Sequence, residues 1–113
     1  MGRSVAMAVS TTLVLINSVM VHAMPQLQLN QRQTILEANR HLLADGWRPA
    51  PELTPSQEER ALANVSLASL SACSGTGVGL CRYDYVRNQQ RLSVVTVPSD
   101  PGKPSVGRVE RWW

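Results

Sequence analysis

The first 23 residues decide how much of this 113-residue chain is left to fold. Arg3 gives a positive start, Val5 to Ile16 is an apolar run broken only by small or hydroxyl residues, and Val21-His22-Ala23 fits the small-x-small pattern that a signal peptidase reads. We therefore predict a cleaved signal peptide over residues 1–23 and a protein exported to the periplasm or the extracellular space. About 90 residues then remain, enough for one small domain.

The same segment has a second interpretation, as an anchor that stays in the membrane. The stretch from Val5 to Val21 is close to the lower limit of about 17 to 25 residues that span a bilayer. Asn17 and Ser18 interrupt it, and no basic cluster follows. These features favour cleavage. A membrane-anchored envelope protein is the alternative if residues 1–23 are retained.

The charge of the remaining part is mild. Arg3 belongs to the signal segment, so the net charge of +3 falls to about +2 for the rest of the chain. Its arginines are spread from Arg32 to Arg111 rather than clustered, which favours a solvated surface over a phosphate-binding stripe. We expect no nucleic-acid partner, and membrane contact only in transit through the signal segment.

The two cysteines form the next constraint, because an oxidising compartment lets a disulfide persist. Cys73 and Cys81 enclose a glycine-rich stretch suited to a tight reversal. We predict that they form a structural disulfide worth about 2.5 kcal/mol in the chain-entropy model. Their spacing is not that of a redox motif, the glycines lack a phosphate-loop pattern, and only His41 remains as a histidine, so we predict no cofactor and no metal site.

Local patterns predict a first helix. Asn30 followed by Gln33 fits a capping box, with the helix running to about Ala44. Gly46 should end it in a left-handed conformation. Trp47 should then fold back onto its last turn as a packing anchor.

Residues 24–31 are expected to be a mobile lead-in to the first helix.

A second helix follows a proline-rich connector. Thr54 as N-cap and Pro55 at the first helical position predict a helix to about Asn64. Ser66 to Ala72 has a period of two, which favours a strand, with a longer second helix as the competitor.

The second half alternates clearly. Cys81 to Arg87 and Arg91 to Val97 are predicted strands joined by a turn at Asn88-Gln89. A proline-rich loop from Pro98 to Pro104 follows, and Val106 to Trp113 is again extended.

The expected fold class is therefore α+β. We expect two N-terminal helices packed on a small antiparallel sheet of about four strands, with one disulfide, in a single domain over residues 32–113.

Several short motifs in combination resemble a group of small, uncharacterised exported bacterial proteins. They are Leu42-Leu43-Ala44-Asp45-Gly46-Trp47-Arg48-Pro49, Cys73-Ser74-Gly75-Thr76-Gly77, Cys81-Arg82-Tyr83-Asp84-Tyr85, Leu92-Ser93-Val94-Val95-Thr96, Val109 and Trp112. The resemblance covers about residues 32–113 and implies no particular activity.

Two classes of function remain. The first is a non-catalytic module that binds a protein or ligand, such as another envelope or extracellular protein, through aromatic residues flanked by arginines. Its candidate binding face comprises Tyr83, Tyr85, Trp112 and Trp113, although both tyrosines suit the core equally well. Trp112 and Trp113 cannot both point inward from one strand. The second class is a small hydrolase that uses Ser74 or His41 with Asp84, for which no catalytic motif is present. We therefore expect a protein that is not an enzyme.

Overall fold

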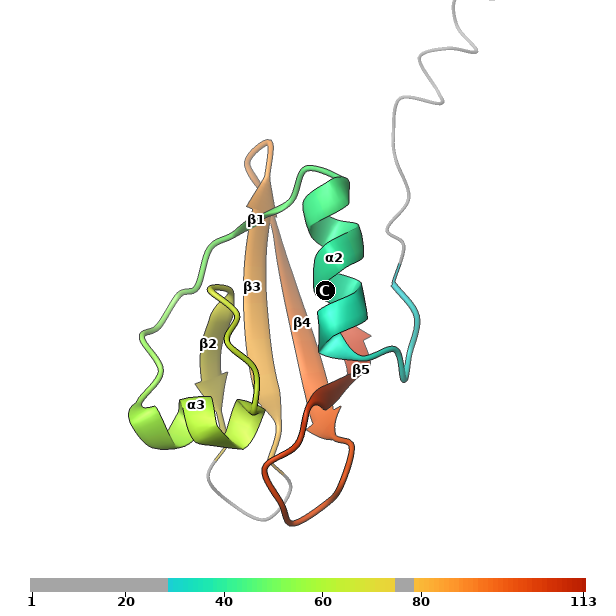
Figure 1. Ribbon diagram of the computed structural model, residues 1–113. Coiled ribbons are helices and arrows are strands. Elements are labelled where there is room, and N and C mark those ends of the chain that lie inside the picture. Colours follow the sequence, from blue (N-terminus) through green and yellow to red (C-terminus); the bar gives the residue numbers. More distant parts are fainter. Residues whose placement is uncertain (1–28, 75–78) are drawn as a thin grey trace, which may run out of the picture.

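The computed structural model describes residues 29–74 and 79–113. The predicted signal peptide and most of the predicted lead-in lie outside the described residues. The chain forms an antiparallel sheet of five strands with two helices (Figure 1). The elements are α2 (Ile35–Ala44), β1 (Arg48–Pro49), α3 (Gln57–Ala63), β2 (Leu70–Cys73), β3 (Cys81–Arg87), β4 (Gln90–Pro98) and β5 (Gly107–Trp112).

The α+β class and the disulfide are confirmed. The Cys73 and Cys81 sulfurs are bonded at 2.07 Å, and the two residues lie directly opposite each other in β2 and β3. The sheet has one strand more than expected, because Arg48 and Pro49 pair with β3. The prolines at positions 49 and 51 predict a stiff extended connector over Arg48 to Leu53, and the structure shows that its first two residues form a strand.

Strand β3 is the centre of the sheet. β1 and β2 pair with different parts of β3, β4 pairs along its full length, and β5 pairs with β4. The predicted hairpin between β3 and β4 is confirmed. Asn88 and Gln89 both have positive φ, at 48° and 70°. That turn geometry matches the right-handed twist of the two strands.

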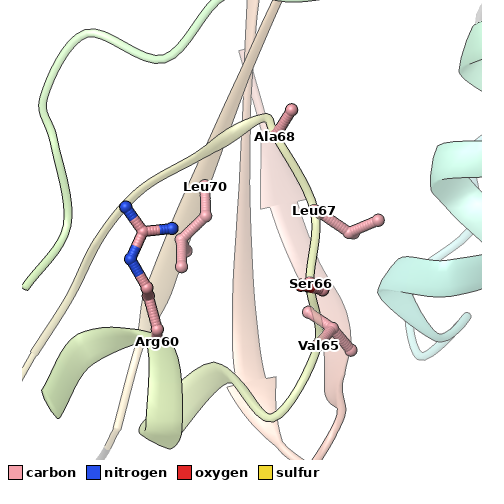
Figure 2. A pocket seen from close by; sticks show the side chains of 6 residues that line it. All are labelled: Arg60, Val65, Ser66, Leu67, Ala68 and Leu70. Carbon is pink, nitrogen blue, oxygen red and sulfur yellow. The ribbon is translucent and has the colours of Figure 1, made fainter. Parts of the chain in front are cut away.

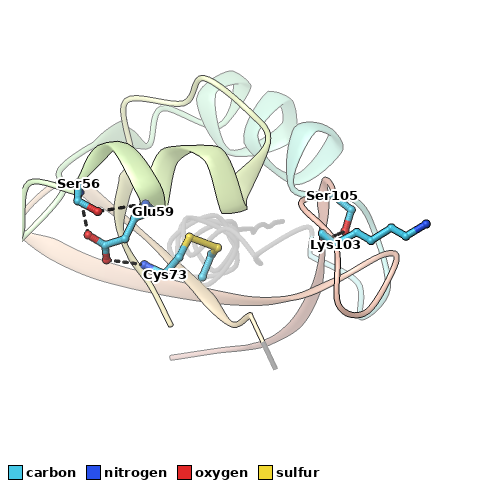
Figure 3. Close-up of a disulfide and its surroundings, with 6 residues drawn as sticks. Ser56, Glu59, Cys73, Lys103 and Ser105 are labelled. Carbon is cyan, nitrogen blue, oxygen red and sulfur yellow. Dashed lines mark hydrogen bonds between the residues drawn. A yellow bond between two sulfur atoms is a disulfide. The ribbon is translucent and has the colours of Figure 1, made fainter. Parts of the chain in front are cut away.

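The two faces of the sheet differ in character. The core face carries Tyr83 and Tyr85 of β3, and the open face carries Arg82 and Asp84 of the same strand, as the alternation predicts. Buried residues of α2 and α3 join the core cluster on the tyrosine side, and Figure 3 shows both helices on the same side of the sheet. The main buried members are Leu29, Ile35, Ala38, Leu42, Trp47, Ala63, Leu70, Tyr83, Tyr85, Leu92, Val94 and Val109.

Helix α2 begins later than predicted. The sequence pattern predicts Asn30 as its N-cap, and the observed N-cap lies four residues further on. Its N-cap is Thr34, which forms a capping box with Glu37. The residues before it are bound to β5 instead: Arg32 N donates to the Val109 carbonyl, and Val109 N donates to the Gln33 carbonyl, each at 2.7 Å. A long-range strand contact therefore overrides the local helix-start signal.

Helix α3 also begins later than predicted. Its N-cap is Ser56 rather than Thr54, because Glu59 completes a capping box with Ser56. The second Glu59 oxygen accepts from the Cys73 backbone N–H at 2.9 Å, so the same carboxylate joins the start of α3 to β2 (Figure 3).

Two further boundaries differ from those predicted. Strand β2 starts at Leu70, later than Ser66, because Ala68 and Ser69 form a turn. At the other end of the sheet, Pro98 belongs to β4, opposite Gly107. A Cβ on Gly107 would lie 2.4 Å from the Thr96 hydroxyl, so this close approach of β4 and β5 requires glycine. Within the described ranges, neither helix is long and apolar enough to cross a bilayer.

Candidate functional site

All three tryptophans of the chain line one hollow at the hairpin end of the sheet. We call it the tryptophan hollow. Its lining consists of Trp47, Arg87, Gln90, Arg91, Leu92, Trp112 and Trp113. These residues come from the end of α2 and from three strands, so the hollow exists only in the folded chain.

Trp47 reaches the hollow through the way α2 ends. Gly46 has φ +90°, its N–H donates to the Leu43 carbonyl, and Trp47 N donates to the Leu42 carbonyl at 2.9 Å. This is the paired hydrogen-bond pattern of a left-handed helix cap, in which the following apolar residue folds back. Trp47 is buried with 4% exposure, as expected for a packing anchor.

Arg87 lies over Trp47 at the end of β3. Its guanidinium carbon is 4.7 Å from the centroid of a Trp47 ring, a cation–π distance. Its Nη1 donates to the Asp45 carbonyl at 2.9 Å. Arg87 thus covers the tryptophan and fastens the end of α2 to the β3–β4 hairpin.

The C-terminal tryptophans approach from β5 and the residue after it. Trp112 lies opposite Val94 on the core face and is half-buried. Trp113 exchanges two backbone hydrogen bonds with Ser93, which places it on the open face. Its exposed fraction is 62%, and the Arg111 guanidinium carbon lies 5.7 Å from a Trp113 ring.

A polar network on the open face holds the rim residue Arg91. Its Nε lies 3.3 Å from Glu52, whose other carboxylate oxygen is 3.0 Å from Arg82 Nη2. Arg82 Nε in turn donates to the buried Asp84 carboxylate at 3.0 Å. Asp84 also accepts from the hydroxyls of Ser71 and Ser93, so one carboxylate links β2, β3 and β4.

The predicted binding face is divided by the fold. Tyr83 and Tyr85 are fully buried on the core face, whereas Trp112 is half-buried and Trp113 is exposed. The expectation that at least one of the two tryptophans points outward is confirmed. Trp47, Arg87 and Arg91 were not assigned to the binding face, because only strand pairing and the cap of α2 bring them to Trp112 and Trp113.

The buried tyrosines have unequal surroundings. Burial raises the pKa of Tyr85 to about 12, and its hydrogen bond with Ser69 opposes that shift. Tyr85 also donates to Asn39 Oδ1 at 2.8 Å. Burial also raises the pKa of Tyr83, and its hydroxyl has no hydrogen-bond partner among the described residues. Both phenols therefore stay protonated at ordinary pH.

Two of the residues considered for a hydrolase, His41 and Asp84, lie on opposite faces of the sheet. His41 lies on α2, where its Nδ1 is 3.3 Å from Gln33 Nε2. Asp84 lies on the open face, bonded to two serines and Arg82. The sheet therefore separates the imidazole from the carboxylate.

A second hollow lies beside α3 and is lined by Arg60, Val65, Ser66, Leu67, Ala68 and Leu70 (Figure 2). Arg60 and Leu70 line one side, and the loop from Val65 to Ala68 runs along the other. This hollow has aliphatic and small polar walls with one charged group, and so lacks the aromatic surfaces of the tryptophan hollow.

The tryptophan hollow offers aromatic and guanidinium groups together. Flat indole faces bind apolar groups, and guanidinium groups donate hydrogen bonds to carboxylates and carbonyls. Tryptophan and arginine are also the residue types most enriched where binding energy concentrates at protein interfaces. The described residues contain no cluster of three or more histidine, cysteine or acidic side chains able to hold a metal ion. No family model matches the chain, and no curated protein and no solved structure shows significant similarity to it.

Proposed function

We propose that the chain is a small exported, non-catalytic module that binds a protein or ligand through the tryptophan hollow. The observation that carries this proposal is the convergence of Trp47, Trp112 and Trp113 from separate parts of the sequence. A domain this small gains little from leaving a tryptophan in water, since burying an aromatic side chain is among its largest sources of stability.

The export part of the proposal is supported by the pattern of residues 1–23 and by the disulfide. Cys73 and Cys81 are bonded and largely buried in a domain of modest size. Disulfides of this structural kind are typical of secreted and periplasmic proteins.

The chemistry of the hollow favours an occupant with an apolar body and an acceptor group. The floor contains Leu92 and Trp47, which are 3% and 4% exposed, and the rim contains Arg87 and Arg91. An apolar side chain would lie against the indoles, while a carboxylate or carbonyl at its edge would accept from a guanidinium. A protein of the cell envelope presents both kinds of group.

The test compares two exposed apolar side chains. Trp113 at the hollow is 62% exposed and Leu53 in the connector is 56% exposed, so alanine at either position should leave the fold intact. We expect the full-length protein and Leu53→Ala to retain the same partner from the envelope fraction, and Trp113→Ala to lose it by about tenfold or more, the scale of an interface hot spot.

The same preparation supplies two controls. The mass of the exported protein shows whether residues 1–23 are removed. Addition of the purified partner should shift tryptophan emission to the blue, since every tryptophan lines the hollow. Equal retention by the Trp113 and Leu53 variants, with no change in emission, would rule out the hollow as the contact surface.

A further inference from the structure

The fold collects arginines that are dispersed in the sequence onto the open face of the sheet. Arg82 occupies this face of β3, and strand register places residues of β1, β4 and β5 beside it. Arg48 and Arg91 lie opposite Val86, Arg111 lies opposite Val95, and Arg108 lies opposite Val97. Five guanidinium groups therefore share one side of four strands.

The carboxylates on this side neutralise only part of that charge. Asp84 is buried and bonded to Arg82, and Glu52 pairs with Arg82 and Arg91. Glu110 lies at the irregularity of β5 and borders the face. Arg48, Arg108 and Arg111 are exposed, and none has an ion pair within the described residues. The open face thus keeps a positive excess.

The helices on the opposite side carry charges of both signs, including Arg40 of α2 and Arg60 of α3. Glu37 lies in the first turn of α2, and Glu58 and Glu59 lie in the first turn of α3. Both helices cover the core face (Figure 3). The basic residues of the helices offset these acidic groups, so the positive excess of the domain lies on the open face.

An exposed tryptophan borders the positive face. Trp113 pairs with Ser93 on the open face, next to Arg111. Indole rings with an apolar body and a polar N–H concentrate where a membrane meets water, and arginines there contact anionic headgroups. The positive charge is spread across a sheet face rather than gathered in a cavity, so it fits a broad anionic surface better than a small anion.

We propose that the open face of the sheet binds peripherally to an anionic lipid surface. Arg48, Arg108 and Arg111 attract the headgroups, and Trp113 enters the interfacial layer. The floor of the tryptophan hollow lies on the core face, and the hollow and the open face share Trp113 and Arg91 at their common edge. Attraction of this kind is electrostatic and is screened by salt.

The experiment compares two double variants of the full-length protein with the same loss of charge. Arg48→Gln/Arg111→Gln changes the open face, whereas Arg40→Gln/Arg60→Gln changes the helices. Binding is measured by co-sedimentation at low salt, with vesicles of phosphatidylcholine alone and vesicles that also contain phosphatidylglycerol. Because every variant shares residues 1–28, any binding through that segment is common to both.

We expect preference for the anionic vesicles, and loss of that preference at high salt. The open-face variant should weaken binding about 25-fold, from roughly fivefold for each surface arginine. The helix variant should bind like the unaltered protein, and Trp113→Ala should abolish the blue shift of emission on vesicle binding.

Three results would overturn the proposal. One is equal binding to both kinds of vesicle. Another is equal weakening by the two double variants, which would assign the effect to net charge rather than to the face. The third is binding to DNA or to polyglutamate at the same salt concentration without binding to anionic vesicles, which would assign the face to a different polyanion. Loss of partner capture by Trp113→Ala, with Arg48→Gln/Arg111→Gln unaffected, tests the hollow separately.

Discussion

Tyr83 and Tyr85 lie two positions apart on β3, are both fully buried and differ in their hydroxyl groups. The Tyr85 hydroxyl accepts from Ser69 at 3.0 Å and donates to Asn39 at 2.8 Å. The Tyr83 hydroxyl has no such partner among the described residues. Burying an unsatisfied hydroxyl costs stability, whereas a bonded one offsets its desolvation. Comparing the two tyrosines therefore distinguishes the stability that comes from packing the ring from the stability that comes from bonding the hydroxyl.

Phenylalanine at these two positions should have opposite effects on stability. Tyr83→Phe removes the unsatisfied hydroxyl and should raise the free energy of unfolding by about 1 kcal/mol. Tyr85→Phe leaves Asn39 and Ser69 without a partner and should lower it by about 1 to 2 kcal/mol. Urea unfolding at neutral pH measures both. A loss of stability in both variants would show that the Tyr83 hydroxyl is bonded in solution.

At the scale of single elements, Glu59 connects a helix to a strand. One carboxylate oxygen accepts from Ser56 N at 2.8 Å, and the other accepts from Cys73 N at 2.9 Å (Figure 3). Glu59 thereby caps α3 and also accepts a hydrogen bond from a backbone N–H of the short strand β2. Side chains that satisfy strand donors also discourage unwanted pairing with other chains.

The stabilising effect of Glu59 should depend on pH. Hydrogen bonds from the Ser56 and Cys73 backbones lower the pKa of Glu59 from 4.5. A lowered pKa means that the ionised carboxylate stabilises the fold above about pH 4.5, and that this contribution is lost as pH falls through the lowered pKa. The urea midpoint of the unaltered protein should therefore exceed that of Glu59→Gln at neutral pH, and the difference should shrink below pH 4.5.

Glu58→Gln is the matched control for this prediction, since Glu58 is in the same turn of α3 but is not the capping-box residue. Its difference from the unaltered protein should change little over the same pH range. Identical acid profiles for the two variants would contradict a special role of Glu59.

A comparison of predicted and observed boundaries shows which elements local sequence patterns can locate. The hairpin of β3 and β4 was predictable, because strict alternation and a turn-forming pair fix it locally. The helix starts were not, because the chain contains overlapping signals: Asn30 with Gln33 competes with Thr34 and Glu37, and Thr54 competes with Ser56. Contacts with β5 and β2 decide between them, and local patterns do not contain those contacts.

At the scale of the whole molecule, the disulfide joins β2 to β3 at the two ends of the segment that links these strands in the sequence. Cys73 and Cys81 are eight residues apart and close the end of β2 onto β3.

The tryptophan hollow could be predicted only in part, because it depends on contacts between distant segments of the chain. Aromatic character and strand alternation point to Trp112 and Trp113, but only the register of β5 and the end of α2 place Trp47 and Arg87 beside them.

Removing the disulfide should destabilise the domain measurably. Cys73→Ala/Cys81→Ala should lower the free energy of unfolding by about 2.5 kcal/mol, a large share of the 5 to 15 kcal/mol typical of small domains. The effect should be matched by the unaltered protein measured in a reducing agent. A difference of less than about 0.5 kcal/mol, within the range of ordinary surface substitutions, would show that the staple contributes little.

The pairing of residues 32–34 with β5 also bears on when folding can finish. Arg108 Nη1 donates to the Arg32 carbonyl across 76 positions of sequence, and Gln31 Nε2 reaches the Glu110 carbonyl across 79. Contacts between such distant segments form late, because a long loop must close before they are made, and folds rich in them fold slowly. The sheet therefore cannot acquire its outer edge until β5 has been synthesised, and the contacts that fix the start of α2 are among the last to form.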